Sequence, residues 1–173
     1  MNIGIISYSY TGNNKALAGN VAKELSAGHI QVSEDKSRSM GAIILDMVFS
    51  RTPQVHPAPD KMKEYDLILF FAPVWMGHIA SPLRPYFQYL KEHPGKYGFI
   101  SISGGADGAN SKLREELNKR TGTDPAVILD LHIADLLPSN PKPARKDTSA
   151  YRLKEKDITK LTDMAVKEVK KII

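Results

Sequence analysis

One stretch decides the fold of this chain of 173 residues: Ile5-Ile6-Ser7-Tyr8-Ser9-Tyr10-Thr11-Gly12-Asn13-Asn14. The run at 3–6 that leads into it is short and mostly β-branched, as a buried strand is. Beyond it, apolar residues recur at helical spacing from Leu17 to Leu25 and predict a helix. A hydroxyl-rich turn with one glycine therefore connects a buried strand to a helix.

The turn has the residue types of an anion cradle. Hydroxyl and amide side chains at a helix start cap free backbone N–H groups. The same N–H groups and the positive end of the helix dipole bind anions, and Gly12 allows the backbone to come close to a ligand. An ordinary helix cap with a turn glycine explains Thr11-Gly12-Asn13 equally well. The turn alone leaves both interpretations open.

Composition bounds the class of protein. Hydrophobic residues make up 42% and charged residues 25%, which predicts one globular domain over residues 1–173. There is no cysteine, which excludes disulfides, thiol nucleophiles and cysteine-ligated metal centres. Redox chemistry would therefore need a bound cofactor. The start of the chain is unlike a signal peptide and no apolar run has bilayer length, so we expect a cytoplasmic protein without a membrane span.

The positive charge is unevenly placed. The formal net charge is +5, and residues 142–156 hold six cations and two anions, an excess of four. Because the remainder is nearly neutral, the chain lacks the broad basic face of a nucleic-acid binder. This basic segment is either a solvated loop or a surface that attracts an anionic ligand.

Apolar segments alternate along the chain. Strands are predicted at 3–6, 30–32, 65–72, 97–102 and 127–129, and helices at 17–25, 40–47, 82–90, 113–117 and 158–172. Such alternation predicts an α/β fold, a three-layer α-β-α sandwich around a five-stranded parallel sheet. Arg84 is predicted to lie on a helix surface.

Three strand-end loops are expected to converge, because ligands of open α/β sheets bind beyond the carboxyl ends of the strands. The first is the turn described above. The second reads Ala72-Pro73-Val74-Trp75-Met76-Gly77-His78, and the third reads Ser103-Gly104-Gly105-Ala106-Asp107-Gly108. A phosphate in the first loop and a flat ring between the other two would fit the set. A core position for Trp75 and a plain turn at Gly104-Gly105 are the alternatives.

These residues resemble the flavodoxin-like FMN-binding family. The resemblance rests on the Ser9 to Asn14 turn, on Pro73-Val74-Trp75-Met76-Gly77, on a helix with Pro82-Leu83-Arg84, and on Ser103-Gly104-Gly105. It covers nearly the whole chain, and it implies the sheet order 2-1-3-4-5 with FMN held noncovalently at the strand ends.

The resemblance also implies a set of site residues. It assigns the FMN phosphate to Ser9, Thr11, Asn13 and Asn14 with the nearby backbone amides, and it adds Tyr10 and Gly12 of the same turn to the cofactor site. It assigns one border of the isoalloxazine to Pro73, Val74, Trp75, Met76, Gly77 and His78, with Trp75 as the aromatic contact, and the other side to Ser103, Gly104 and Gly105. No catalytic side chain and no metal are assigned, since no carboxylate pair or histidine cluster has metal-ligand spacing.

Two departures bear on the function. Electron-carrier flavodoxins are typically acidic and carry an aromatic residue in the loop after the fourth strand, whereas this chain is basic and its loop at 103–108 has none. Both departures favour an FMN-dependent oxidoreductase that takes hydride from NAD(P)H and reduces a quinone-like or other small acceptor. An electron carrier serving a redox partner protein and a flavin-free binding module remain alternatives. The oligomeric state stays open.

Overall fold

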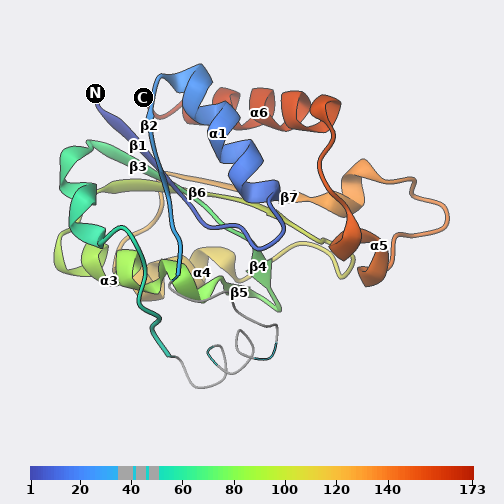
Figure 1. The fold of residues 1–173 in the computed structure, drawn as a ribbon, viewed down its shortest axis with the longest axis horizontal. Helices are drawn as coiled ribbons and strands as arrows, with labels where there is room; N and C mark the ends of the chain where they lie inside the picture. The colour runs from blue at the N-terminus through green and yellow to red at the C-terminus, as the bar shows by residue number, and fades with distance from the viewer. Residues whose placement is uncertain (35–40, 42–45, 47–50) are drawn as a thin grey trace.

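The central sheet has five parallel strands. The computed structural model describes residues 1–34, 41, 46 and 51–173 (Figure 1). The strands are β1 (Ile3–Ser7), β2 (Gly28–Gln31), β3 (Leu67–Phe71), β6 (Lys96–Ser103) and β7 (Val127–His132), in the order β2-β1-β3-β6-β7. Every neighbouring pair is parallel. The predicted five-stranded parallel sheet is therefore confirmed.

A short hairpin, which the sequence did not predict, changes the numbering. β4 (Val74–Trp75) and β5 (His78–Ile79) pair in antiparallel fashion as a separate two-stranded sheet. Met76 and Gly77 form its tip with φ of 50° and 78°, and positive φ at both residues is typical of a two-residue type I′ turn. Because the hairpin follows β3, the sheet order along the chain is 2-1-3-6-7 rather than the expected 2-1-3-4-5.

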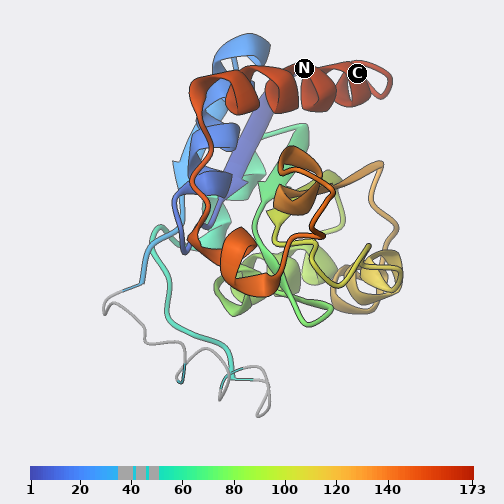
Figure 2. The same ribbon diagram turned by 90° about the vertical axis from the view of Figure 1, so that its right-hand side faces the viewer.

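Helices cover both faces of the sheet. α1 (Asn13–Leu25) and α6 (Glu155–Val169) pack together on one face, and α3 (Arg84–Glu92) and α4 (Leu113–Thr121) pack together on the other (Figure 1). Shorter elements are the 3₁₀ helices η1 (Pro59–Glu64), η2 (Ser81–Leu83) and η3 (Ile133–Leu136), and the short α-helix α5 (Arg145–Ala150). Figure 2 shows the two chain termini at the same end of the molecule, beside α6. The three-layer prediction is confirmed.

The sheet separates two apolar cores. All residues of β1 and β3 are buried, and alternate side chains of a strand point to opposite faces. Phe70 accordingly packs against Phe87 of α3 with ring centroids 5.0 Å apart, whereas Phe71 belongs to the core beneath α1 and α6. Burial on both faces explains the continuous apolar sequence of these strands.

Two expectations, the helix at 40–47 and the lack of a membrane span, concern residues that the structure describes only in part. The helix predicted at 40–47 lies almost wholly outside the described residues. Among the helices of the described ranges, none has the length and apolar character needed to cross a bilayer.

Candidate functional site

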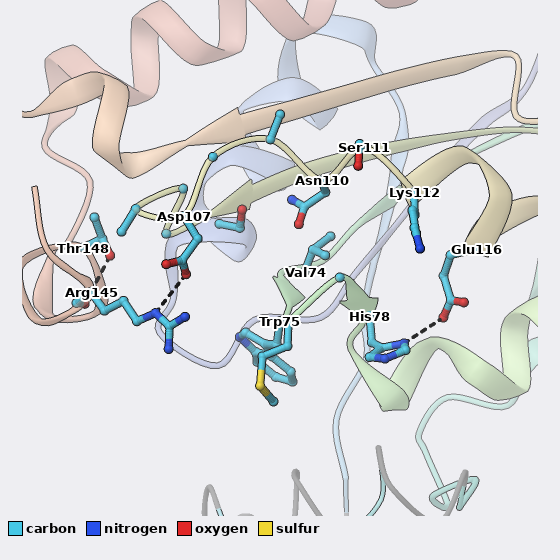
Figure 3. A pocket seen from close by; sticks show the side chains of 18 of the residues that line it. Val74, Trp75, His78, Asp107, Asn110, Ser111, Lys112, Glu116, Arg145 and Thr148 are labelled. Carbon is cyan, nitrogen blue, oxygen red and sulfur yellow. Dashed lines mark hydrogen bonds and ion pairs between the residues drawn. The ribbon is translucent and has the colours of Figure 1, made fainter.

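A pocket of about 1060 Å³ opens at the carboxyl ends of the strands (Figure 3). Its walls are the β4–β5 hairpin, the glycine-rich loop at 103–112, one side of α4, and Arg145 and Thr148 of α5. Small-molecule sites measure about 300–1,000 Å³, so the pocket is large enough for a whole ligand. The predicted site residues that line it are Val74, Trp75, Met76, Gly77, His78, Ser103, Gly104 and Gly105. Pro73 is buried, and its carbonyl accepts a hydrogen bond from the Ala80 N–H at 3.2 Å.

The turn at 9–14 lies outside the lining of this pocket. Gly12 is the N-cap of α1 with φ of 92°, and a Cβ built on it would meet nothing within 4 Å. The Ser9 hydroxyl is buried, and it has no hydrogen-bond partner in the described part of the chain. The turn thus combines an unpartnered hydroxyl, an uncrowded left-handed backbone and the free N–H groups of a first helical turn. These are the features of an anion cradle.

Asn13 and Asn14 use their side chains elsewhere. Asn13 Nδ2 donates to the Tyr151 carbonyl at 3.0 Å, and Asn13 Oδ1 accepts from the Leu153 N–H at 3.1 Å. Asn14 likewise makes two hydrogen bonds with the backbone of Ile102: its Nδ2 donates to the Ile102 carbonyl at 2.9 Å, and its Oδ1 accepts from the Ile102 N–H at 3.0 Å. Both side chains therefore fasten the turn to its surroundings. An anion at the turn would meet their backbone N–H groups.

Trp75 joins the turn to the pocket. Its ring meets those of Tyr8 and Tyr10 edge-on, with centroids 6.4 and 6.1 Å away. Trp75 is partly exposed and lines the pocket, so it is not a core aromatic. Beside it, Tyr10 is 46% exposed and Met76 is 70% exposed. The outer rim of the site therefore presents apolar side chains to solvent.

The glycines of the second wall are required by close packing. Gly105 has φ of 73°, and a Cβ there would lie 2.3 Å from Cβ of His132. A Cβ on Gly104 would lie 3.0 Å from Oγ1 of Thr148. The loop is thus pressed against the end of β7 and against α5, and at Gly104 and Gly105 it faces the pocket with backbone alone. This packing accounts for glycine at both positions beyond the needs of a plain turn.

A polar network that was not predicted from the sequence anchors the same loop. Asn110 donates to Asp130 from its backbone N–H and from its side chain, both at 3.0 Å, and His132 Nε2 lies 3.1 Å from Asp130 Oδ2. Burial alone would raise the pKa of Asp130, but the bonds from His132 and Asn110 outweigh it and the pKa lies below its ordinary value. The bond to Asp130 raises the pKa of His132 against the opposing effect of burial. Spacing of two on one strand places Asp130 and His132 on one face, which was the available signal.

Two pairs of polar side chains stand at opposite ends of the pocket (Figure 3). Arg145 Nε donates to Asp107 at 2.8 Å in an exposed pair, so the basic segment reaches the pocket through Arg145. At the other end, His78 Nδ1 lies 3.6 Å from Glu116 Oε1. Arg120 holds the same carboxylate at 2.6 Å.

Arg84 is not on a helix surface, contrary to the prediction. It is the first residue of α3 and only 7% exposed. Its Nη1 donates to the carbonyls of Asp46 at 2.8 Å and Arg51 at 2.5 Å. An arginine in a first helical turn gives no sequence signal of such burial, because the segment that accepts its bonds is more than thirty residues away.

Comparison with known proteins identifies the fold. No protein-family model matches the chain, and no curated protein matches its sequence. Among solved structures, the flavoprotein of Lactobacillus acidophilus in complex with FMN is 22% identical with a TM-score of 0.61, over 75% of this chain and 92% of that one. The oxidised flavodoxin of Bacillus cereus is 15% identical with a TM-score of 0.53, over 98% of both chains. An archaeal flavodoxin is 13% identical with a TM-score of 0.53, over 99% of both. The chain has the flavodoxin-like fold.

Proposed function

We propose that this protein binds FMN at the carboxyl ends of its strands. The observation that carries the proposal is the arrangement of the large pocket next to the turn at 9–14, with Trp75 between them. The flavoprotein of Lactobacillus acidophilus, which is similar in fold, was solved in complex with FMN, and this supports FMN as the ligand.

The phosphate would lie in the turn. Ser9 offers a buried hydroxyl without a partner in the described part of the chain, and Gly12 leaves open space beside the first turn of α1. Neutral donors and the helix dipole suffice to hold a phosphate monoester in such a place. Thr11 is half-buried in the same turn and would add a second hydroxyl.

The ring would lie between the hairpin and the glycine-rich loop. Trp75 supplies an aromatic wall, and the backbone of Gly104 and Gly105 supplies polar groups on the facing side. When bound, FMN would supply the electron-transfer chemistry, since the chain has no cysteine and no assigned catalytic side chain. The chain's own task is to orient the ring and to limit its contact with water.

The single tryptophan makes binding directly measurable, because Trp75 is the only one in the chain. Titration with FMN is expected to quench its fluorescence to saturation, and the purified protein is expected to show a flavin spectrum. Riboflavin, which lacks the phosphate, serves as the matched control and should bind much more weakly. Unchanged fluorescence at saturating FMN, together with a colourless protein, would favour the flavin-free binding module.

We further propose that the loaded protein oxidises NAD(P)H and reduces a quinone-like or other small acceptor. The volume of the pocket and the absence of an aromatic residue from the loop at 103–108 support room for a second ring beside the flavin. A carrier role with a redox partner protein fits the same site. Steady-state oxidation of NADH or NADPH by a quinone separates the two, because a carrier without a partner would show negligible turnover.

A further inference from the structure

A second pocket lies where α3 and α4 pack together, and Arg120, which lines it, pairs with Glu116 of the first pocket. It has a volume of about 200 Å³, several times the space of about 30 Å³ that one water molecule occupies. Its described lining residues are Thr52, Arg84, Phe87, Gln88, Lys91 and Arg120. Three of these carry positive charge, and no carboxylate lines the pocket within the described ranges.

Arg84 lines this pocket, and part of its guanidinium makes no hydrogen bond. Its Nη1 is taken by the carbonyls of Asp46 and Arg51. Its Nε is buried without a hydrogen-bond partner, and within the described residues its hydrogen bonds come from Nη1 and not from Nη2. Nε and Nη2 form the side-on edge of a guanidinium, which binds two oxygens of a phosphate or carboxylate at once. Arg84 also forms no ion pair in the part of the chain that the structure describes.

The surroundings leave this positive charge largely uncompensated. Burial lowers the pKa of Arg84, the positive charge of Arg120 lowers it further, and Glu116 opposes them. Glu116 is already held by Arg120 at 2.6 Å. Buried charges are normally paired, because an unpaired one is costly to desolvate. A guanidinium in this position therefore calls for an anion.

The remaining lining residues stand where they would complete such a site. Arg84, Gln88 and Lys91 are spaced at i, i+4 and i+7 on α3, so they share one face of the helix. Lys91 is exposed and has no ion pair within the described residues. Its flexible ammonium can reach an anion bound beside Arg84, while Phe87 gives the pocket an apolar side.

We propose that this pocket binds a phosphate-type oxyanion, held side-on by Arg84 and enclosed by Arg120 and Lys91. The ligand is either free inorganic phosphate or the phosphate group of a small phosphorylated compound. The site is distinct from the turn at 9–14 and stands whether or not the protein binds FMN.

The test is a titration of the full chain with inorganic phosphate in a phosphate-free buffer, followed by NMR of the Arg84 Nε–H. The Arg84→Lys variant keeps the positive charge but lacks the guanidinium. The Nε–H resonance that is missing from its spectrum is therefore that of Arg84. We expect a saturable shift of this signal in the parent protein. Because the readout belongs to one residue, phosphate bound at the turn does not produce it. A signal that does not move at saturating phosphate overturns the proposal.

Variants of the two other cations complete the test. Lys91→Ala and Arg120→Gln are each expected to weaken phosphate binding by about tenfold, the size of a charge-assisted bond. Lys160→Ala removes an exposed lysine from α6 on the opposite face of the sheet and should leave the affinity unchanged. Equal affinities for phosphate in all three variants would overturn the assignment of Lys91 and Arg120 to the site.

The relative affinities of the protein for different anions identify where the bound phosphate group comes from. Tighter binding of glycerol 3-phosphate than of inorganic phosphate supports a phosphorylated compound as the ligand, and the reverse order supports the free ion. Acetate binding as tightly as either would contradict the assignment to a phosphate-type oxyanion.

Discussion

At the residue scale, the Ser9 hydroxyl is the sharpest pointer to a bound anion. It is buried and has no hydrogen-bond partner in the described part of the chain. An unsatisfied buried hydroxyl costs stability unless a ligand completes it. The folded protein without ligand therefore carries a small penalty at the place where a phosphate would relieve it.

Ser9→Ala should separate the stability penalty of the buried Ser9 hydroxyl from its contribution to ligand binding. We expect the free energy of unfolding of the ligand-free protein to stay equal or rise, and the affinity for FMN to fall by about tenfold. Thermal unfolding and Trp75 fluorescence titration measure the two quantities. Ser101→Ala is the control, because the Ser101 hydroxyl of β6 is also buried without a partner but does not belong to the turn. Equal affinity losses in both variants would contradict the assignment of Ser9.

Gly105 allows a second test at this scale. Gly105→Ala introduces a Cβ that overlaps His132, whereas Gly108→Ala introduces one that meets nothing within 4 Å, and both positions have positive φ. Gly108→Ala should cost the roughly 1–2 kcal/mol of a left-handed backbone. Gly105→Ala should cost at least about 1 kcal/mol more, because the overlap adds to that penalty. Equal free energies of unfolding in urea would show that the loop is not pressed on His132.

At the element scale, the end of β7 controls the position of the glycine-rich loop. Asp130 and His132 project from this strand to Asn110 and Gly105 of the loop. One wall of the pocket thus depends on a charged pair, with Asp135 a further 3.8 Å from His132 Nδ1. The attachment should therefore respond to pH.

The sign of that response follows from the two pKa shifts. The pKa of His132 is raised above 6.5, so its stabilising contribution is complete below that value and is lost as pH rises through the folded-state pKa. The pKa of Asp130 lies below 3.8, so its contribution is present above 3.8 and is lost as pH falls through the folded-state pKa. His132→Gln should therefore destabilise the protein more at about pH 5 than at about pH 9. Urea unfolding at the two pH values checks this, and a pH-independent difference would rule out the charged pair.

At the scale of the whole molecule, burial decides which features the sequence reveals. β1 and β3 are buried on both faces, and their apolar runs predicted the strands and the parallel sheet. The hairpin was missed because Met76 takes a left-handed conformation that usually falls to glycine or asparagine. The bonds of Asn13 were missed for another reason: its partners lie 138 and 140 residues away, and no local pattern records them.

The charge distribution belongs to the same scale. If NADPH is the donor, neutralising Lys142, Arg145 and Lys146 together should raise the KM for NADPH by roughly tenfold at low salt, with a smaller effect at high salt. Arg145 lines the pocket, whereas Lys156 of the same segment does not, so Lys156→Gln is the control. Steady-state kinetics with NADPH and NADH at two ionic strengths give the answer. An unchanged KM would mean that the segment is only a solvated surface.

The hydrogen bonds of the Asn13 side chain to residues far along the chain have a consequence for folding during synthesis. During synthesis, the first strand, the turn and the first helix emerge well before Tyr151 and Leu153 exist, yet those two residues supply the bonds that hold the Asn13 side chain. Contacts so distant in sequence form late, because a long loop must close first. We expect that the nascent chain cannot capture its ligand early, and that loading follows the arrival of the last helix rather than guiding the folding that precedes it.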